Sequence, residues 1–237
     1  MSDPTPALRA DELYRFYHAG QEEVLALRGV TLAVRTGELV AVVGPSGSGK
    51  STLLACLAGI DDPDGGAVHV LGQRLSRVPE RDRARLRARS IGVLLQSGNL
   101  VEHLTVAQNV GLARAVAGRR SRRAARSSGR AARPRRTTRP LLDRLGLGGA
   151  AGRLPATLSG GEAARAGLAV ALAGDPAVLL ADEPTGELDS ATGAEVVALL
   201  REQADRHGRA VLAVTHSLAL TGRADRVLTL RDGRLSP

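Results

Sequence analysis

The sequence of 237 residues has no tryptophan, one phenylalanine, two tyrosines and a single cysteine. One cysteine excludes an internal disulfide, and the position of Cys56 in the apolar run TLLACLAG predicts a buried thiol in a reducing compartment. Because aromatic residues make up only 1% of the chain, the core has to be built mainly from alanine, valine and leucine. The chain is long enough to bury a substantial core of this kind.

Long hydrophobic runs are also missing. No apolar run approaches the roughly 18 to 20 residues that a membrane-spanning helix needs. The first residues, MSDPTPALRADEL, lack the basic and apolar regions of a signal peptide. We therefore expect a cytoplasmic protein.

Acidic residues are absent from residues 117–140, AGRRSRRAARSSGRAARPRRTTRP, where ten arginines gather. The net charge of +9 is therefore a property of this segment and not of the whole chain. For this reason, we expect no specific nucleic-acid partner.

Lysine occurs once among the 33 cationic side chains, at Lys50 in GPSGSGKST. Residues 44–51 fit the pattern G-x-x-x-x-G-K-[ST] between a predicted strand and a predicted helix, which is the context of a phosphate-binding loop. Gly47 and Gly49 let successive N–H groups point at phosphate oxygens. A lysine fits between the β- and γ-phosphates, where the wide planar fork of arginine does not fit in the same way.

The predicted ligand of this loop is ATP with Mg²⁺. The nucleotide-binding residues assigned to the loop are Gly44, Ser46, Gly47, Ser48, Gly49, Lys50, Ser51 and Thr52, and Ser51 is also a metal ligand. The apolar strand VLLADE ends in Asp182, which we expect beside the metal, and in Glu183, which we expect to polarise the attacking water. A glycine loop that only connects two elements, with an exposed acid pair elsewhere, is the alternative, and the full motif in context favours the phosphate site.

Strands and helices alternate along most of the chain, which predicts an α/β fold with a mostly parallel sheet and a ligand at the carboxyl ends of its strands. Strands are expected within residues 31–44, 65–72, 90–96, 177–184 and 210–216, and a hairpin at 225–236. Helices are expected at residues 50–59, 104–118, 161–174 and 190–208, and residues 77–90 as a solvated helix or loop.

Four further motifs, in this order, make the chain resemble the nucleotide-binding subunit of an ATP-binding cassette (ABC) transporter. Gln96 in GVLLQ resembles the Q-loop, and LSGGE at residues 158–162 resembles the family's signature motif. GELDS at 186–190, with Asp189, resembles the D-loop, and His216 in VLAVTH resembles the switch histidine. Glu162 departs from the family, which usually has glutamine at this position.

The resemblance implies a P-loop NTPase core with a mostly parallel sheet, an N-terminal antiparallel β part and a helical subdomain at about residues 97–175. We expect residues 1–10 to be disordered and residues 11–237 to form one ABC ATPase domain.

The resemblance also implies a head-to-tail dimer with a second copy or a homologous ATPase subunit. Each ATP would lie between the phosphate loop of one subunit and Ser159, Gly160 and Gly161 of the other. Asp189 of the D-loop is also assigned to the nucleotide-binding residues. Glu183 would be the general base, His216 would contact the γ-phosphate, and Gln96 would help to arrange Mg²⁺ and water.

All three aromatic residues lie in YRFY, residues 14–17. Tyr17 stands where the family places the residue that stacks on adenine, and a flat aromatic face suits a purine. Tyr14 and Phe16 fit a strand that packs inward, and a purely structural role for Tyr17 is the alternative.

Within the family, LRGVTLAV and QSGNLVEHLTVAQNV look most like exporters of the lipoprotein-releasing and macrolide-efflux type. This resemblance implies an integral membrane permease as partner and a peripheral location on the inner face of the cell membrane. Two alternatives are a soluble ABC-type ATPase acting on nucleic acid or ribosomes, and a non-hydrolysing subunit that binds ATP as a regulator.

The arginine-rich segment, residues 117–140, has three interpretations. It could contact anionic lipid headgroups, bind nucleic acid non-specifically, or be a poorly ordered stretch without a role. Pro134, Pro140 and the paired glycine and serine positions predict that no long helix continues through it.

Overall fold

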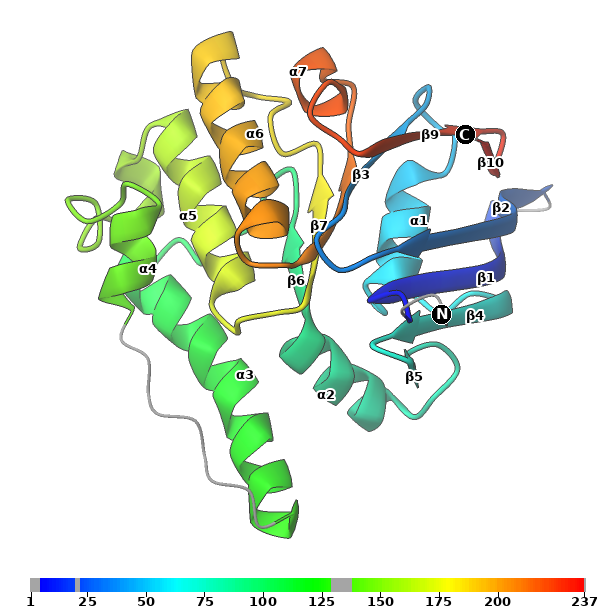
Figure 1. Cartoon of the computed structure of the whole chain (residues 1–237), viewed down its shortest axis with the longest axis horizontal. Helices are drawn as coiled ribbons and strands as arrows, with labels where there is room; N and C mark the ends of the chain where they lie inside the picture. Colours follow the sequence, from blue (N-terminus) through cyan, green and yellow to red (C-terminus); the bar gives the residue numbers. More distant parts are fainter. Residues whose placement is uncertain (1–4, 20–21, 129–137, 237) are drawn as a thin grey trace.

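The computed structural model describes residues 5–19, 22–128 and 138–236, which form two β-sheets with helices between and beside them (Figure 1). The large sheet has the strand order β10-β9-β3-β8-β7-β6, and the small sheet has the order β2-β1-β4-β5. The predicted α/β class is confirmed, with a parallel core and a separate antiparallel part.

The large sheet is parallel in every pairing except that of β10 with β9. Because β3, β8 and β7 are parallel neighbours, the segments that follow them emerge at the same edge of the sheet. This edge brings together the glycine loop after β3, the acid pair at the end of β7 and the histidine after β8. The strands are β3 (Leu39–Val43), β6 (Ile91–Leu94), β7 (Val178–Asp182), β8 (Ala210–Val214), β9 (Arg226–Arg231) and β10 (Arg234–Ser236).

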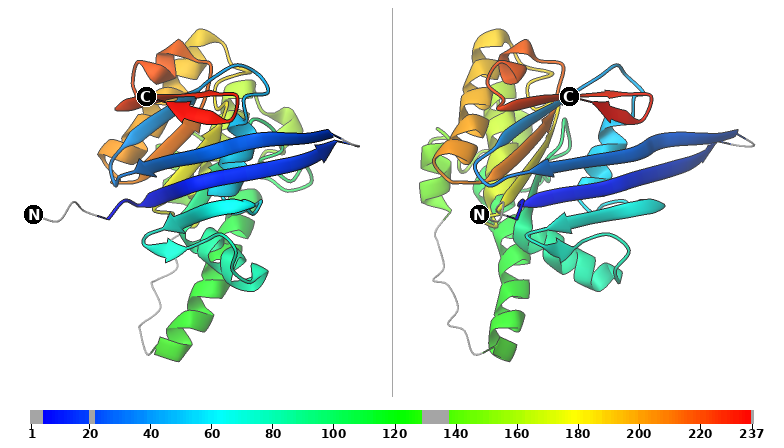
Figure 2. Two further views of the ribbon diagram at one scale, coloured as in Figure 1. Left: turned by 90° about the vertical axis from the view of Figure 1, so that its right-hand side faces the viewer. Right: turned by 45° about the vertical axis from the view of Figure 1, so that its right-hand side comes forward.

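The small sheet is antiparallel, and its two longest strands extend past the body of the molecule (Figure 2). Its strands are β1 (Leu8–Ala19), β2 (Glu22–Val34), β4 (Gly65–Val70) and β5 (Gln73–Arg74). The disorder expected for residues 1–10 is wrong for Leu8 to Ala10, because Leu8 and Ala10 are fully buried and pair with both β2 and β4. Residues 1–4 lie outside the described part of the chain.

Two hydrophobic cores lie on the two faces of the large sheet. Val40 and Val42 face α1 and the small sheet, whereas Leu39 and Ala41 face α3, α5 and α6, as strand alternation requires. Figure 1 shows α1 between the two sheets. Cys56 on α1 is 1% exposed, and burial raises the pKa of its thiol to about 12, which confirms the predicted buried thiol.

The helices occupy most of the predicted positions. They are α1 (Lys50–Leu57), α2 (Glu80–Ser90), α3 (Val106–Ser128), α4 (Arg139–Arg144), a 3₁₀ turn (Pro155–Thr157), α5 (Gly160–Leu172), α6 (Ser190–Asp205) and α7 (Leu218–Thr221). From α3 to α5 they lie within the residues expected to form a helical subdomain. Within the described residues, none of them combines the length and the apolarity of a membrane span.

Helix α3 is longer than the helix expected at residues 104–118. It runs for 23 residues to Ser128 and projects from the body (Figure 1), so a long helix does enter the segment. Alanine and arginine are strong helix formers, and Pro134 and Pro140 lie beyond the end of α3. Residues 129–137 lie outside the described residues, and the three interpretations of residues 117–140 stay predictions.

Candidate nucleotide-binding site

The glycine loop between β3 and α1 takes a backbone path that side chains would block. A Cβ atom at Gly49 would lie 2.4 Å from the carbonyl oxygen of Ala26, and Gly49 has a φ of 102°. A Cβ atom at Gly44 would lie 2.0 Å from the carbonyl oxygen of Leu230. Glycine is required at both positions because the loop is pressed against β2 and β9.

The first turn of α1 fits an anion. Helix α1 begins at Lys50 with Gly49 as its N-cap, no side chain caps it, and no acid lies in its first turn. The amide groups at this end are therefore available to a ligand. Ser48 Oγ, in the loop just before, is buried without a hydrogen-bond partner, as expected where a bound group supplies the missing contact.

Lys50 is the cation of this loop. Its side chain is buried, and its Nζ donates to the carbonyl oxygens of Gly44 at 2.8 Å and Pro45 at 2.9 Å. Neutral carbonyls hold the ammonium group in place without cancelling its charge. A phosphate in the loop would therefore meet a positioned positive charge.

A cavity of about 540 Å³ opens over the loop. It is lined by residues of the loop and of α1, and also by residues of β2 and of the β9–β10 turn. The sequence analysis did not assign the residues of β2 and of this turn to the site. Its lining is Val24, Leu25, Ala26, Arg28, Gly47, Gly49, Lys50, Ser51, Thr52, Asp232 and Gly233. The turn sequence RDGR signals a hairpin, but no local signal shows that this hairpin lies over the phosphate loop.

Asp182 and Ser51 meet across the edge of the large sheet. Ser51, in the first turn of α1, makes a side-chain hydrogen bond with Asp182, the last residue of β7. Burial raises the pKa of the Asp182 carboxyl, and the bond from Ser51 opposes that shift. A hydroxyl and a carboxylate side by side form the donor set that Mg²⁺ uses together with phosphate oxygens and water, so these residues fit the metal.

Glu183 and His216 lie together at the same edge of the large sheet, where β7 and β8 end. Glu183 has a φ of 42°, and its N–H donates to the carbonyl of Val214 on β8 at 2.9 Å. Its Oε2 accepts from the backbone N–H of His216 at 3.2 Å, and its buried Oε1 lies 3.4 Å from His216 Nε2. A left-handed conformation at a non-glycine residue costs about 1 to 3 kcal/mol and is frequent at functional sites.

Gln96 follows β6, the strand beside β7, and its side chain is exposed. The turn that carries it is held by Asn99, whose Oδ1 accepts from the Leu95 N–H at 2.8 Å and whose Nδ2 donates to the Leu95 carbonyl at 2.6 Å. Sequence reasoning missed Asn99. The role of Gln96 with metal and water stays a prediction.

The residues of LSGGE form the start of α5. Ser159 is the N-cap, and its side chain and that of Glu162 form a reciprocal capping box. Glu162 also pairs with Arg153 at 2.8 Å, and the backbone N–H of Ser159 lowers the pKa of its carboxyl. At position 162, where the family usually has glutamine, glutamate therefore makes the capping bond that glutamine would make.

The start of α5 lies close to the start of α6. A Cβ atom at Gly161 would lie 2.4 Å from the Cγ2 of Thr192, so a larger residue there would displace Thr192. Asp189 is the N-cap of α6 and accepts from the N–H groups of Ala191 and Thr192, each at 3.0 Å. Neither Asp189 nor Ser159, Gly160 and Gly161 is among the residues that line the cavity over Lys50.

Tyr17 lies on β1 and is also not among the lining residues of that cavity. Its hydroxyl donates to Asp61 Oδ2 at 3.0 Å, and the Arg15 guanidinium carbon lies 4.8 Å from the centre of its ring. Its partner in the β-ladder, Val24, does line the cavity. Stacking of Tyr17 on adenine stays a prediction.

Comparison with known proteins agrees with these features. Residues 27–186 match the family model described as ABC transporter. The lipoprotein-releasing system ATP-binding protein LolD of Maricaulis maris is 41% identical over 230 residues, 97% of this chain and 96% of LolD. The macrolide export ATP-binding/permease protein MacB of Shigella flexneri is 41% identical over 98% of this chain, which spans 34% of that longer protein.

A solved structure shows the same fold. The dimeric structure of MJ0796, a bacterial ABC transporter cassette, superimposes with a TM-score of 0.83 at 31% identity and covers 97% of both chains. The similarity to LolD, to MacB and to MJ0796 confirms the family resemblance and the fold. The chain belongs to the ABC transporter family and is one of its ATP-binding cassettes, an ATPase.

Proposed function

We propose that this cassette hydrolyses ATP with Mg²⁺ in a head-to-tail dimer and drives export by a separate integral membrane permease. The observation that supports the dimer is that the signature residues and the phosphate loop do not line the same cavity. Ser159 to Gly161 are not among the residues lining the cavity over Lys50, so a second subunit has to supply them. The dimeric MJ0796 cassette supports this arrangement.

The residues of one subunit divide the chemistry among them. Lys50 and the loop amides bind phosphate, and Ser51, Asp182 and Gln96 would hold Mg²⁺, which neutralises phosphate charge when bound. Glu183 accepts a proton from the attacking water. His216 contacts the γ-phosphate, and its position beside Glu183 lets it sense whether that phosphate is present.

The permease and the export direction rest on the relatives. The printed names of LolD and MacB describe lipoprotein release and macrolide export, and both match nearly the whole of this chain. We infer a cytoplasmic cassette that lies on the inner face of the membrane. The transported substrate is set by the permease.

The test is a pull-down from native membranes with tagged Glu183→Gln protein and Mg-ATP, with Lys50→Ala as the matched control. We expect a specific integral membrane protein with the first variant and a much weaker yield with the second. Recovery of ribosomes or nucleic acid alone would instead support the soluble ATPase. Monomeric Glu183→Gln protein in saturating Mg-ATP would contradict the head-to-tail dimer.

A further inference from the structure

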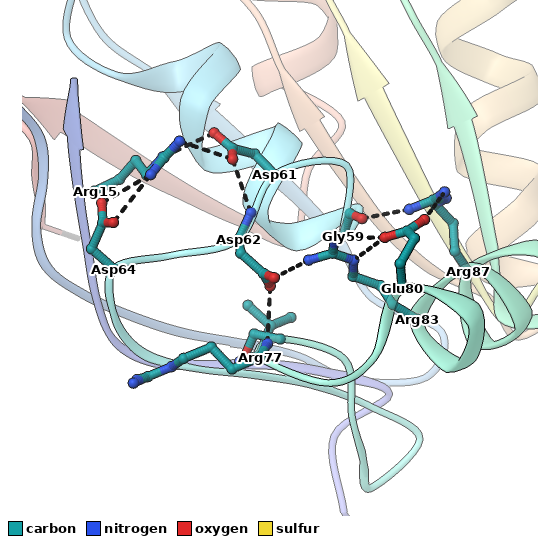
Figure 3. A network of polar contacts seen from close by, with 11 residues as sticks. Arg15, Gly59, Asp61, Asp62, Asp64, Arg77, Glu80, Arg83 and Arg87 are labelled. Atoms are coloured by element: carbon teal, nitrogen blue, oxygen red, sulfur yellow. Dashed lines mark hydrogen bonds and ion pairs between the residues drawn. The ribbon is translucent and has the colours of Figure 1, made fainter. Parts of the chain in front are cut away.

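The loop after α1 is held by arginines from two other elements (Figure 3). Arg15 of β1 donates to both oxygens of Asp61, at 2.9 and 3.0 Å, and also to Asp64 at 3.0 Å. Arg83 of α2 pairs with Asp62. The loop is thereby pinned to the small sheet on one side and to α2 on the other.

Tyr17 is attached to this network at two points. Its hydroxyl donates to Asp61 Oδ2 at 3.0 Å, and the guanidinium group of Arg15 lies over its ring at 4.8 Å from the centroid. Arg15 itself is fixed, because its side chain is only 20% exposed and it is bonded to two carboxylates. The ring of Tyr17 is therefore held at its tip and on one face.

Tyr17 is partly exposed, and its partner in the β-ladder lines the cavity. Tyr17 is 38% exposed. It pairs with Val24 in the β-ladder, and paired residues of neighbouring antiparallel strands project their side chains to the same side of the sheet, about 5 Å apart. Since Val24 lines the cavity over the phosphate loop, Tyr17 lies on the strand next to one wall of that cavity.

We propose that Asp61 and Arg15 are positioning residues that hold Tyr17 as a preformed platform for the base of the nucleotide. Arg15 covers one face of the ring, and the opposite face receives a purine, so that cation, phenol and base stack in sequence. This inference rests on the proposed binding of ATP with Tyr17 against adenine.

The platform lowers the cost of ordering an exposed side chain when ATP binds. Immobilising one side chain of this kind reduces affinity by about three- to tenfold when it is not already ordered. We therefore expect Asp61→Ala to weaken ATP binding by about three- to tenfold through Tyr17. Asp62→Ala is the matched control, because Asp62 lies in the same loop and pairs with Arg83 instead.

The experiment is an ATP titration of the full chain in five variants: Asp61→Ala, Asp61→Asn, Asp62→Ala, Tyr17→Phe and the double variant Tyr17→Phe with Asp61→Ala. Phenylalanine keeps the ring but lacks the hydroxyl that donates a hydrogen bond to Asp61. If Asp61 acts through that hydroxyl, Asp61→Ala weakens binding in the parent chain and adds little in the Tyr17→Phe background. Asp61→Asn, which keeps an oxygen acceptor, should restore part of the loss.

A second readout uses the scarcity of aromatic residues. The chain has two tyrosines and no tryptophan, so Tyr14→Phe leaves Tyr17 as the single tyrosine emitter. In that background, without nucleotide, Asp61→Ala should raise the emission, because a hydrogen bond to a carboxylate quenches a phenol. Asp62→Ala should leave the emission unchanged.

The inference is overturned if Asp61→Ala leaves ATP affinity unchanged, or if its effect is equally large in the Tyr17→Phe background. The second result would mean that Asp61 acts only on the loop. Failure of the underlying function has a different signature. Unchanged affinity in Tyr17→Ala would refute stacking on Tyr17, and no ATP binding by the parent chain would refute the proposed function itself.

Discussion

The Nε2 atom of His216 lies 3.4 Å from Oε1 of Glu183, 33 residues away in the chain. The two residues meet because β7 and β8 are parallel neighbours and Glu183 is anchored by its N–H to Val214. This contact joins the proposed base to the proposed γ-phosphate sensor.

Glu183→Gln should bind ATP with parental affinity while turnover falls by about 10²- to 10⁴-fold, because glutamine cannot accept the proton of the attacking water. Phosphate release gives the rate, and nucleotide titration gives the affinity. Parental turnover in this variant would show that Glu183 is not the base.

Lys50→Arg should weaken ATP binding by about 1.5 to 3 kcal/mol, which is about 10- to 150-fold. The carbonyls of Gly44 and Pro45 hold Nζ in place, and the wider planar guanidinium group of arginine does not match this pair of bonds in the same way. Isothermal titration of Lys50→Arg beside Lys50→Ala checks this. Arginine binding as tightly as lysine would refute the geometric reason for the single lysine.

Asp182→Asn should raise the thermal stability of the nucleotide-free protein at neutral pH while abolishing Mg²⁺-dependent turnover. Burial raises the pKa of Asp182 in the folded chain, so folding favours its neutral form. Stability therefore falls as pH rises through the interval between the ordinary carboxyl pKa and the raised folded value, and the cost persists above it. Asparagine carries no such charge.

Asp189 should show the opposite pH dependence of stability to Asp182, because its pKa is lowered and not raised. Its capping bonds to Thr192 and Ala191 lower its pKa, so its charged form stabilises the fold above the ordinary carboxyl pKa, and this stability is lost as pH falls. Asp189→Ala should therefore lower the melting temperature at neutral pH. A fall with Asp182→Asn, or a rise with Asp189→Ala, would contradict these assignments.

Gly49→Ala should destabilise the nucleotide-free protein by about 2 to 4 kcal/mol, because it adds a clash with the Ala26 carbonyl to an unfavourable φ. Gly47→Ala is the matched control. Gly47 has a φ of 78°, but its added Cβ would meet no atom within 4 Å, so strain alone should cost about 1 to 2 kcal/mol. Urea unfolding separates the two, and equal losses would argue against the close approach of β2.

Glu162→Gln should leave the free energy of unfolding nearly unchanged, since glutamine also completes the capping box and the lost ion pair with Arg153 is exposed. Glu162→Ala should lower the free energy of unfolding, because alanine cannot make the capping bond. Chemical denaturation of both variants checks the difference. A large loss with glutamine would mean that the charge of Glu162 matters more than its capping bond.

The chain by itself determined the phosphate loop, the acid pair and the order of strands and helices. These features follow from local chemistry: Lys50 needs its glycine neighbours, and Asp182 has to end an apolar strand to reach a metal. The parallel order could be inferred because short strands alternate with helices. The early start of β1 was not predicted, because Leu8 becomes buried only against β2 and β4. The full length of α3 was not predicted either, because alanine and arginine continue the helix beyond Gly118, where the expected helix ended.

Only the tertiary structure decided which distant residues share the site. Arg28, Asp232 and Gly233 line the cavity because the small sheet and the β9–β10 turn fold over the loop, and no local pattern encodes that contact. The attachment of Tyr17 to Asp61 likewise spans 44 residues. Sequence patterns report periodicity and local bonding, whereas the pairing of these residues depends on how two sheets pack around α1.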